Sequence, residues 1–399
     1  MPPSTDALLE RLLSGIEREL PRAVDLRRRL HSQPELAHRE EHTAATVAAE
    51  LEVPAVTVAH TGRMARVGAA GRPPVVVRAE LDGLPIAERT SAPFAAAGET
   101  MHACGHDVHM AALVSLTRAA HALGEELPVP LLAVFQPSEE AYPSGAEQLA
   151  GSELAAEAPA AVVAAHVHPE LPWATVAIDA GAVNASSDSV EIAVEGQPSH
   201  GAYPHHGRDP ILAIAEIVVS LHAQVGRRID PHGPAVLTVG VLEGGRTENV
   251  IPARARARAS LRAQRPEDRL LLRRLVEEVV AGIAAAHGCR ASVTLVPGEP
   301  ALENDPEIVA RARELLAAAG LEPAPQWRSC GSDDFAFFGA LAPLAMAFVG
   351  LDGAEGFENR PLHHPEFLPP DGAVAAVARA QAVLYVAAAR VADTRGTMT

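Results

Sequence analysis

Residues 101–110, MHACGHDVHM, concentrate side chains that could do chemistry: three histidines, an aspartate and one of the chain's three cysteines. Cys104 and His106 are two positions apart, so in an extended or loop segment both side chains point the same way. Thiolate and imidazole are ligands for zinc and its neighbours, although a buried cysteine beside a turn fits the pattern equally well. Asp107 precedes the helical pattern 108–123, and we expect it to be the N-cap.

Two adjacent carboxylates, Glu139 and Glu140, follow the apolar segment VPLLAVFQPS. Like charges at the end of a hydrophobic strand repel each other and are hard to explain as solvated surface, although two glutamates in a surface loop are the alternative. A bound metal resolves the conflict, because one glutamate then becomes a ligand and the other remains a general base beside it. We therefore expect Glu140 to be a ligand and Glu139 to be the base.

Two histidine pairs add further candidates. His166 and His168 close the apolar segment AAVVAAHVHP, and His363 and His364 occur in PLHHPEF. A lone histidine is more often structural, but these candidates follow several separate strands of one inferred sheet. The good ligands are Cys104, His106, Glu140, His166 and His363. Five ligands exceed what one tetrahedral zinc with an open position needs, and they fit two metals bridged by water.

The elements that must position these residues are those of an α/β sheet. Continuous apolar segments at 73–82, 129–140 and 160–169 alternate with helical patterns, which is typical of strands covered on both faces. Ligands of such sheets lie at the carboxyl ends of the strands, where Glu80 and Asp82 also stand. The predicted fold is a catalytic three-layer α/β/α domain.

Residues 186–297 change to the order β-α-β-β-α-β, which is a ferredoxin-like unit. We expect it to be a lid inserted into a catalytic domain formed by residues 1–185 and 298–399. The lid contains His200, which could donate to an oxyanion or simply lie in a surface loop. It also contains Asn249, whose amide could hold a substrate carboxylate or carbonyl.

The alternation of Arg254, Arg256 and Arg258 has a period of two, so we expect these arginines to lie on the solvated face of a strand rather than in an anion site.

Composition excludes several classes of function. The formal charge is −17, from 33 basic and 50 acidic residues, and it opposes binding to nucleic acid. Every basic residue is arginine, which excludes Schiff-base and P-loop lysine chemistry. The sequence contains no apolar run of about 18 residues, the length that would predict a membrane span. The N-terminal pattern lacks a signal-peptide core. Three scattered cysteines suit a reducing compartment, so we expect a cytoplasmic protein.

The motifs taken together resemble the amidohydrolase branch of the di-metal aminoacylase and carboxypeptidase superfamily, which includes hippurate hydrolase, N-acetyl-diaminopimelate deacetylase and auxin-conjugate hydrolases. The match extends from about residue 30 to 370. The segments that carry it are RAELDGLP, MHACGHDVHMAALV, FQPSEE, AHVHP, SHGAYPH, ENVIPARA, GSDDFAFF and LHHPEF.

The resemblance implies a role for each matching residue. The five ligands named above match its metal ligands, with His363 preferred over His364 by a His-x-Pro pattern, and Glu139 matches its general base. Asp82 matches an aspartate that supports the metal centre. His200 matches a lid histidine that steadies the tetrahedral intermediate, often in the partner subunit, and Asn249 matches a substrate-binding position.

Two positions depart from the family pattern, which has aspartate where Glu80 stands and glutamate where Asp333 stands. Each change keeps the charge and alters the reach by one methylene, so we expect altered geometry around the metal ligands rather than lost activity.

The expected function is metal-dependent hydrolysis of N-acyl amino acids to a carboxylic acid and a free amino acid. The expected cofactors are two divalent ions per subunit, drawn from Zn, Mn, Co and Ni. A dipeptidase or carboxypeptidase with the same centre, a thiol hydrolase using Cys104 and an inert metal-binding protein are the alternatives. The expected partners are the substrate and a second subunit, as a homodimer or dimer of dimers through the lid, without nucleic acid or membrane.

Overall fold

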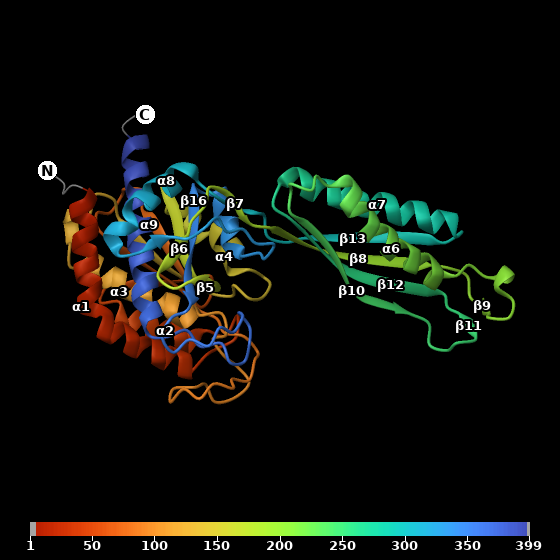
Figure 1. Ribbon diagram of the computed structural model, residues 1–399, viewed down its shortest axis with the longest axis horizontal. Helices are drawn as coiled ribbons and strands as arrows, with labels where there is room; N and C mark the ends of the chain where they lie inside the picture. Colours follow the sequence, from red (N-terminus) through yellow and green to blue (C-terminus); the bar gives the residue numbers. More distant parts are fainter. Residues whose placement is uncertain (1–4, 397–399) are drawn as a thin grey trace. The chain divides into compact units, whose positions relative to one another are not determined.

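The computed structural model describes residues 5–396, and the chain divides into two compact units (Figure 1). Unit 1 comprises residues up to Gly181 together with Glu303–Trp327 and the segment from Phe337 onward. Unit 2 comprises Ala182–Leu302 and Arg328–Ala336. The second unit therefore extends a few residues beyond each end of the expected segment 186–297, and it includes a short piece from the C-terminal third.

Unit 1 is built on an eight-stranded sheet with the order β1-β2-β4-β3-β5-β16-β6-β15. The central pairs β4·β3, β3·β5 and β5·β16 are parallel. The strands are β1 (Ala55–Val58), β2 (Gly62–Val67), β3 (Val75–Glu80), β4 (Leu131–Gln136), β5 (Ala161–Pro172), β6 (Thr175–Ala177), β15 (Glu322–Pro323) and β16 (Leu344–Asp352). Every residue of β3 and β4 is buried, so both faces of the sheet are covered, as the continuous apolar segments predicted.

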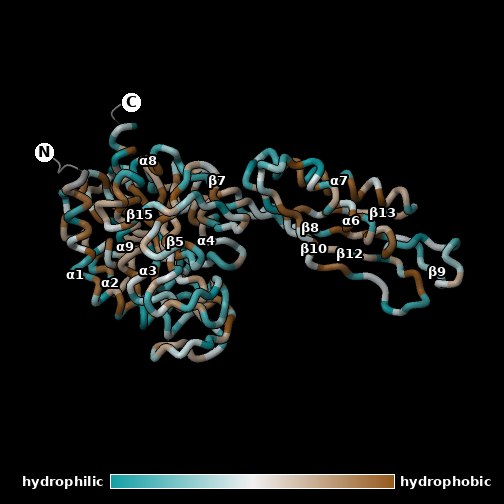
Figure 2. The backbone as a smooth tube through the Cα atoms, viewed as in Figure 1, coloured by the Kyte–Doolittle hydropathy of each residue, from teal (hydrophilic) through white to brown (hydrophobic). Residues whose placement is uncertain are grey.

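Helices cover this sheet and complete the α/β fold predicted from the sequence. The helix α9 packs on β3, β5 and β16, and it also contacts α1, α3 and α8. The helices of unit 1 are α1 (Thr5–Ser32), α2 (Glu41–Glu50), α3 (His106–His121), α4 (Gly145–Ala150), α5 (Glu153–Ala156), α8 (Pro306–Leu315) and α9 (Gly372–Gly396). Apolar residues run along the inner strands and these helices (Figure 2), and one face of the sheet forms a continuous core with α1, α2, α3, α8 and α9.

Unit 2 is a four-stranded antiparallel sheet with the order β10-β12-β8-β13 and two helices. Its chain order is β8 (Ser186–Glu195), α6 (Pro210–Arg228), β10 (Ala235–Gly244), β12 (Arg254–Ala263), α7 (Pro266–Ala286) and β13 (Arg290–Pro297), interrupted by the short pair β9 (Ser199–His200) and β11 (Val250–Ile251). The two helices pack on the sheet and bury a separate hydrophobic core. The β-α-β-β-α-β order is thus the one read from the sequence.

Local sequence signals set several helix starts. Asp209 precedes Pro210, and its carboxylate accepts the Ile211 N–H at 2.9 Å, so α6 begins with a capped, proline-led turn. Asp305 and Pro306 begin α8 in the same way.

The expected cap of α3 was wrong. The N-cap is Gly105, and Asp107 lies inside the first turn of the helix. There its buried carboxylate pairs with Arg27 at 2.7 Å and with His31 at 2.9 Å, both from α1. A carboxylate with those charged partners ties α3 to α1 instead of capping its own helix.

Two helices are long and apolar enough to cross a membrane by length and composition, namely Pro210–Arg228 and Gly372–Arg395. Of the most apolar window in Gly372–Arg395, 83% is buried inside the fold, as in the core helix of a globular domain. The corresponding value for Pro210–Arg228 is 28%, because one face packs on its sheet while Leu212 and Val219 are exposed. Such helices are common in soluble folds, so they carry little weight for a membrane location.

Candidate metal centre

The five predicted ligands and Glu139 gather at one place in unit 1. Their donor atoms form overlapping triplets in which all atoms lie within 4.8 Å of one another. The triplets are Cys104, His106 and His166; Cys104, Glu140 and His363; and His106, Glu139 and Glu140. Because each triplet shares a residue with another, the donors form one connected cluster that is larger than the shell of a single four-coordinate ion.

Four separate segments supply these side chains, and one of them is β5, which contains His166. Cys104 precedes α3, and His106 is its first residue. Glu139 and Glu140 follow β4, and His363 lies in a loop before α9, where its N–H donates to the carbonyl of Ala103 at 2.8 Å. That bond fixes the distant C-terminal loop beside the start of α3.

Gly105 allows α3 to begin this close to the sheet. Its φ of +84° is a left-handed conformation that favours glycine. A Cβ atom at this position would lie 2.5 Å from a methyl group of Val167. The glycine between Cys104 and His106 is therefore required by both conformation and space.

Strand β5 differs from the expectation that His166 and His168 close it. His166 and His168 lie within β5, which continues to Pro172, and do not end it. His166 joins the candidate centre, whereas the ring of His168 packs against Trp327, with the ring centroids 4.7 Å apart. Burial lowers the pKa of His168, which fits a structural role for this histidine.

Two of the histidines present the same nitrogen to the centre. His106 donates from Nδ1 to the carbonyl of Asp82 at 2.9 Å, and His166 donates from Nδ1 to the carbonyl of Val167 at 2.6 Å. In each ring Nε2 is then the nitrogen that faces the centre, and it can bind a metal once it carries no proton. The buried Nε2 of His106 has no hydrogen-bond partner within residues 5–396.

The spacing of the donor atoms fits divalent cations. The Sγ of Cys104 lies 3.5 Å from Nε2 of His166, and tetrahedral zinc with ordinary bond lengths places sulfur and nitrogen about 3.5 Å apart. Glu140 Oε1 lies 3.2 Å from Nε2 of His363, yet it accepts no hydrogen bond from the described residues. Both spacings are short enough for the two donor atoms to bind one ion together.

The electrostatics of the pocket favour a cation over a free thiolate. Burial, followed by the charges of Glu140 and Glu139, raises the pKa of the Cys104 thiol well above its ordinary value. Burial would lower the pKa of His106, but the carboxylates of Glu80 and Asp82 outweigh it and raise that pKa to about 10. A reactive cysteine needs electropositive surroundings, so this cysteine is poorly placed to act as a nucleophile alone.

Asp82 joins two parts of the centre. Its carbonyl accepts from His106, and its Oδ2 accepts the N–H of Glu140 at 2.9 Å. Burial would raise the pKa of Asp82, but its hydrogen bonds with His106 and with the backbone of Glu139 and Glu140 lower it. The aspartate therefore stays ionised and fixes the relative positions of a ligand and the expected base.

Arg78 and His109, which the sequence analysis gave no role, form a buried chain with Glu80 behind the centre. Arg78 pairs with Glu80, whose second oxygen accepts from Nδ1 of His109 at 2.8 Å. Nε2 of His109 in turn accepts the N–H of Val167 at 3.0 Å. Burial would raise the pKa of Glu80, but Arg78 and then His109 hold it well below its ordinary value. An arginine inside the apolar strand VVVRAE was the available signal for this network.

The remaining predicted site residues, His200 and Asn249, lie together in unit 2. His200 ends β9 and Asn249 directly precedes β11, and Gly201 donates to the carbonyl of Asn249 at 2.7 Å. Nδ1 of His200 accepts the N–H of Ala202 at 3.1 Å, so the exposed Nε2 carries the proton. Asn249 accepts from the Thr247 hydroxyl at 2.8 Å, which leaves its NH₂ group available to donate.

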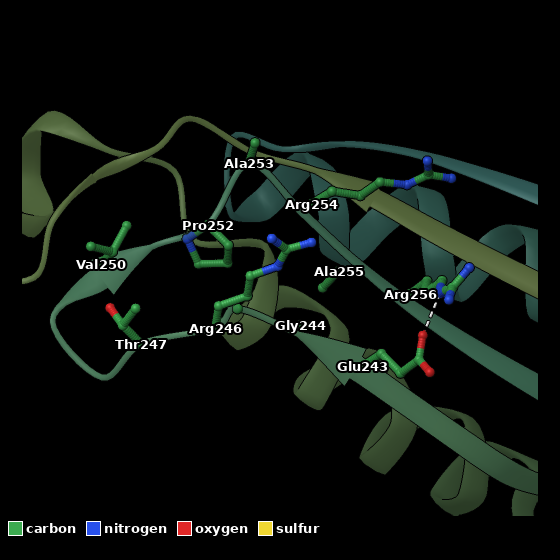
Figure 3. Close-up of a pocket in the computed structure, with 11 residues that line it drawn as sticks. Glu243, Gly244, Arg246, Thr247, Val250, Pro252, Ala253, Arg254, Ala255 and Arg256 are labelled. Atoms are coloured by element: carbon green, nitrogen blue, oxygen red, sulfur yellow. Dashed lines mark hydrogen bonds and ion pairs between the residues drawn. The ribbon is translucent and has the colours of Figure 1, made fainter.

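The same ribbon borders a cavity of about 600 Å³ in unit 2 (Figure 3). Arg246, Arg254 and Arg256 lie on its walls, and Arg256 pairs with Glu243. Along β12, Arg254, Arg256 and Arg258 are exposed while the alanines that alternate with them are buried. The prediction of a solvated arginine face is confirmed.

Asp333, one of the two departures from the family pattern, is buried and accepts the N–H of Phe335 at 2.8 Å. It thereby caps the short 3₁₀ helix Asp334–Ala340. The shorter carboxylate is suited to this local bond, because an aspartate side chain readily reaches the N–H two residues ahead.

The fold and the cluster of possible metal ligands are those of a di-metal hydrolase. Residues 76–386 match the model of peptidase family M20/M25/M40, and the chain belongs to this family. The family resemblance drawn from the sequence motifs is confirmed.

Curated relatives match over most of their length. The chain is 33% identical to N-acetyl-L-cysteine deacetylase of Bacillus subtilis, covering 96% of this chain and 90% of that one. It is 34% identical to N-acetyldiaminopimelate deacetylase of Halalkalibacterium halodurans, covering 87% and 95%. Among solved structures, the YXEP protein of Bacillus subtilis, a dinuclear metal binding peptidase from the M20 family, is 29% identical with a TM-score of 0.81, covering 93% and 98%. These matches agree with the predicted α/β fold class.

Proposed function

We propose that this protein is a metal-dependent amidohydrolase that cleaves N-acyl amino acids into a carboxylic acid and a free amino acid. One observation carries the proposal: a partly buried cluster of thiol, imidazole and carboxylate donors gathers from distant parts of the chain, with Glu139 beside them. The names of the deacetylase relatives support the same reaction class.

The residues present fit two divalent cations, with Cys104, His106, Glu140, His166 and His363 as the proposed ligands. When bound, such ions would polarise the scissile carbonyl and acidify the attacking water. Their identity among Zn, Mn, Co and Ni stays a prediction. The mixed sulfur, nitrogen and oxygen donor set favours transition metals over magnesium or calcium.

Glu139 is the proposed general base. Its Oε2 lies 3.9 Å from Nε2 of His106, and its side chain is more exposed than that of His106, 13% against 1%. A carboxylate in this position can take a proton from the attacking water and return it to the leaving amine. Asp82 supports this step by fixing the backbone at Glu140.

The proposed roles of the unit 2 residues follow from their free donors. His200 offers Nε2–H, which suits stabilisation of a developing oxyanion. Asn249 offers its NH₂ group, which suits a substrate carboxylate or carbonyl oxygen. We infer that both act in the lid of the expected two-domain arrangement.

A hydrolysis screen tests the proposed function. The purified protein is treated with chelator, reconstituted with each of Zn, Mn, Co and Ni, and supplied with N-acetyl, N-benzoyl and longer N-acyl amino acids and with dipeptides. Release of free amino acid from the N-acyl substrates, lost on chelation and restored by metal, supports the proposal. Preferential cleavage of dipeptides would support the peptidase alternative. Activity indifferent to chelators but lost on thiol alkylation would support Cys104 as nucleophile.

We further propose a homodimer formed through unit 2. Strand β10 is at the edge of its sheet, and α6 exposes Ile211, Leu212 and Val219, which are 40%, 58% and 70% exposed. An open strand edge beside an apolar helix face is suited to pairing with a second copy. Sedimentation velocity should give a dimer for the wild type and a monomer for Val219→Glu; a wild-type monomer at micromolar concentration would contradict the proposal.

A cytoplasmic location stays a proposal as well. Cys104, Cys289 and Cys330 form no disulfide within residues 5–396, which agrees with a reducing compartment.

A further inference from the structure

The turn that carries Glu139 and Glu140 has an unusual backbone. Ser138 has a φ of +51°, a left-handed conformation that costs a non-glycine residue free energy. Such a residue persists only where its surroundings fix it, so the contacts of Ser138 show what holds the turn in place.

Three successive N–H groups of this turn point at buried carboxylates. The N–H of Ser138 donates to Glu40 Oε1 at 2.8 Å, and that of Glu140 donates to Asp82 Oδ2 at 2.9 Å. The backbone of Glu139 also hydrogen-bonds to Asp82. Asp82 belongs to the centre itself, whereas Glu40 comes from a distant segment that contributes no proposed ligand.

Glu40 is completely buried, and its described partners are all neutral. Besides the N–H, Ser138 offers its hydroxyl at 3.2 Å, and Thr61 donates its hydroxyl to Oε2 at 2.8 Å. Within residues 5–396 Glu40 forms no ion pair. Burying a carboxylate without a cation is costly, and hydrogen bonds to its oxygens are the compensation.

A structural role at the start of α2 does not explain this carboxylate. Glu40 is the N-cap residue of α2, yet its side chain makes no capping hydrogen bond. Half of the carboxylate is instead directed at Ser138. The neighbouring His38 reinforces the same contact, since its N–H donates to the Ser138 hydroxyl oxygen at 2.9 Å and its Nδ1 lies 2.9 Å from that oxygen.

We propose that Glu40 is a positioning residue for the metal centre. By holding Ser138 in the left-handed conformation, it sets the direction in which the next two residues present a base and a ligand. The inference rests on the proposed function for the roles of Glu139 and Glu140, but the backbone contacts stand independently of it.

The test compares metal retention and kinetics in matched variants. Glu40→Ala removes the acceptor, Glu40→Gln keeps an oxygen at the same reach, and Glu40→Asp keeps the charge but shortens the side chain. Thr61→Val is the control, because it removes the other hydrogen bond of Glu40 without touching Ser138. The double variant Glu40→Ala/Ser138→Gly tests whether glycine, which adopts a positive φ without strain, restores the conformation of the turn.

Each Co²⁺-loaded protein is titrated with a chelator, and cobalt absorption and bound metal are followed without substrate. Glu40→Ala should release one of its two ions at a chelator concentration about 10-fold or more below that of the wild type, because Glu140 is displaced. Its kcat should fall by about 10- to 100-fold with KM little changed. Glu40→Gln and Thr61→Val should retain metal like the wild type, and Ser138→Gly should recover part of the loss.

The proposal is overturned if Glu40→Ala keeps wild-type metal retention and kcat, if Thr61→Val loses metal equally, or if the glycine restores nothing. Should Glu40→Ala fail to fold, the comparison of Glu40→Asp with Glu40→Gln decides: equal retention overturns the proposal and selective loss in Glu40→Asp supports it. If wild-type protein hydrolyses no N-acyl amino acid, the proposed function fails, while the metal titration still tests Glu40.

Discussion

In the proposed reaction, the carboxylate of Glu139 transfers the proton. Glu139→Gln keeps the size of the side chain but cannot accept that proton, so we expect kcat to fall by at least about 100-fold. Metal content by elemental analysis should stay at the wild-type level, because Glu139 is not a proposed ligand. A variant with near-wild-type turnover would remove Glu139 from the role of base.

His200 tests the oxyanion role at a residue that contributes little to folding. The side chain is exposed, so His200→Ala should leave the melting temperature unchanged while kcat falls by about 100-fold. His205→Ala is the matched control, since this histidine is exposed in the same loop. Equal kinetics for the two variants would make His200 an ordinary loop residue.

Elements transmit their geometry to the centre through close backbone contacts, and the start of α4 is an example. A Cβ on Gly145 would lie 1.8 Å from the carbonyl oxygen of Pro137, and the N–H of Gly145 donates to the backbone carbonyl of Ser138 at 3.1 Å. The helix therefore begins directly against the turn that carries Glu139.

Gly145→Ala should displace that turn. We expect a loss of about 1–3 kcal/mol in the free energy of unfolding from overpacking, together with a fall in kcat of about 10-fold or more. Gly151→Ala, at the other end of α4, is the control, because its added Cβ would meet its nearest atom at 3.5 Å. Thermal unfolding and initial rates measure both effects, and an active, stable Gly145→Ala enzyme would show that the turn can yield.

At the level of the whole molecule, unit 2 has its own core and its own buried ion cluster. Asp188 accepts from Arg269 at 2.6 Å and from Arg273 at 2.7 Å. Burial would raise the pKa of Asp188, but hydrogen bonds from these arginines outweigh it and lower the pKa to about 2. A carboxyl group whose pKa is depressed on folding stabilises the fold above its ordinary value near 4, and this contribution is lost as pH falls through 2.

Asp188→Asn should therefore destabilise the protein by about 2 kcal/mol at neutral pH, less than for a fully buried pair because both arginines are partly exposed. The difference in unfolding free energy between wild type and variant should shrink between about pH 4 and pH 2. Denaturant unfolding across this range measures it. A difference that is constant with pH would show that Asp188 is not the titrating group.

The sequence by itself determined the fold class and the set of candidate donors. Continuous apolar segments require a sheet covered on both faces, and ligand chemistry limits which side chains can bind a transition metal. Cys104 and Glu140 could therefore be named without coordinates, and the family resemblance added the choice of His363 over His364. These three residues span more than two hundred residues of chain, and the fold brings their donor atoms within 4.8 Å of one another.

Only the tertiary structure decided how those donors are held. Asp107 pairs with Arg27, which is 80 residues away in sequence. Glu40 accepts the N–H of Ser138, which is 98 residues away. Local preference for Asp107 was to cap α3, yet a charged arginine is a stronger partner for a carboxylate than a backbone N–H group. Sequence patterns report local conformation and burial, whereas the partner of a buried charge depends on which distant segments the fold packs against it.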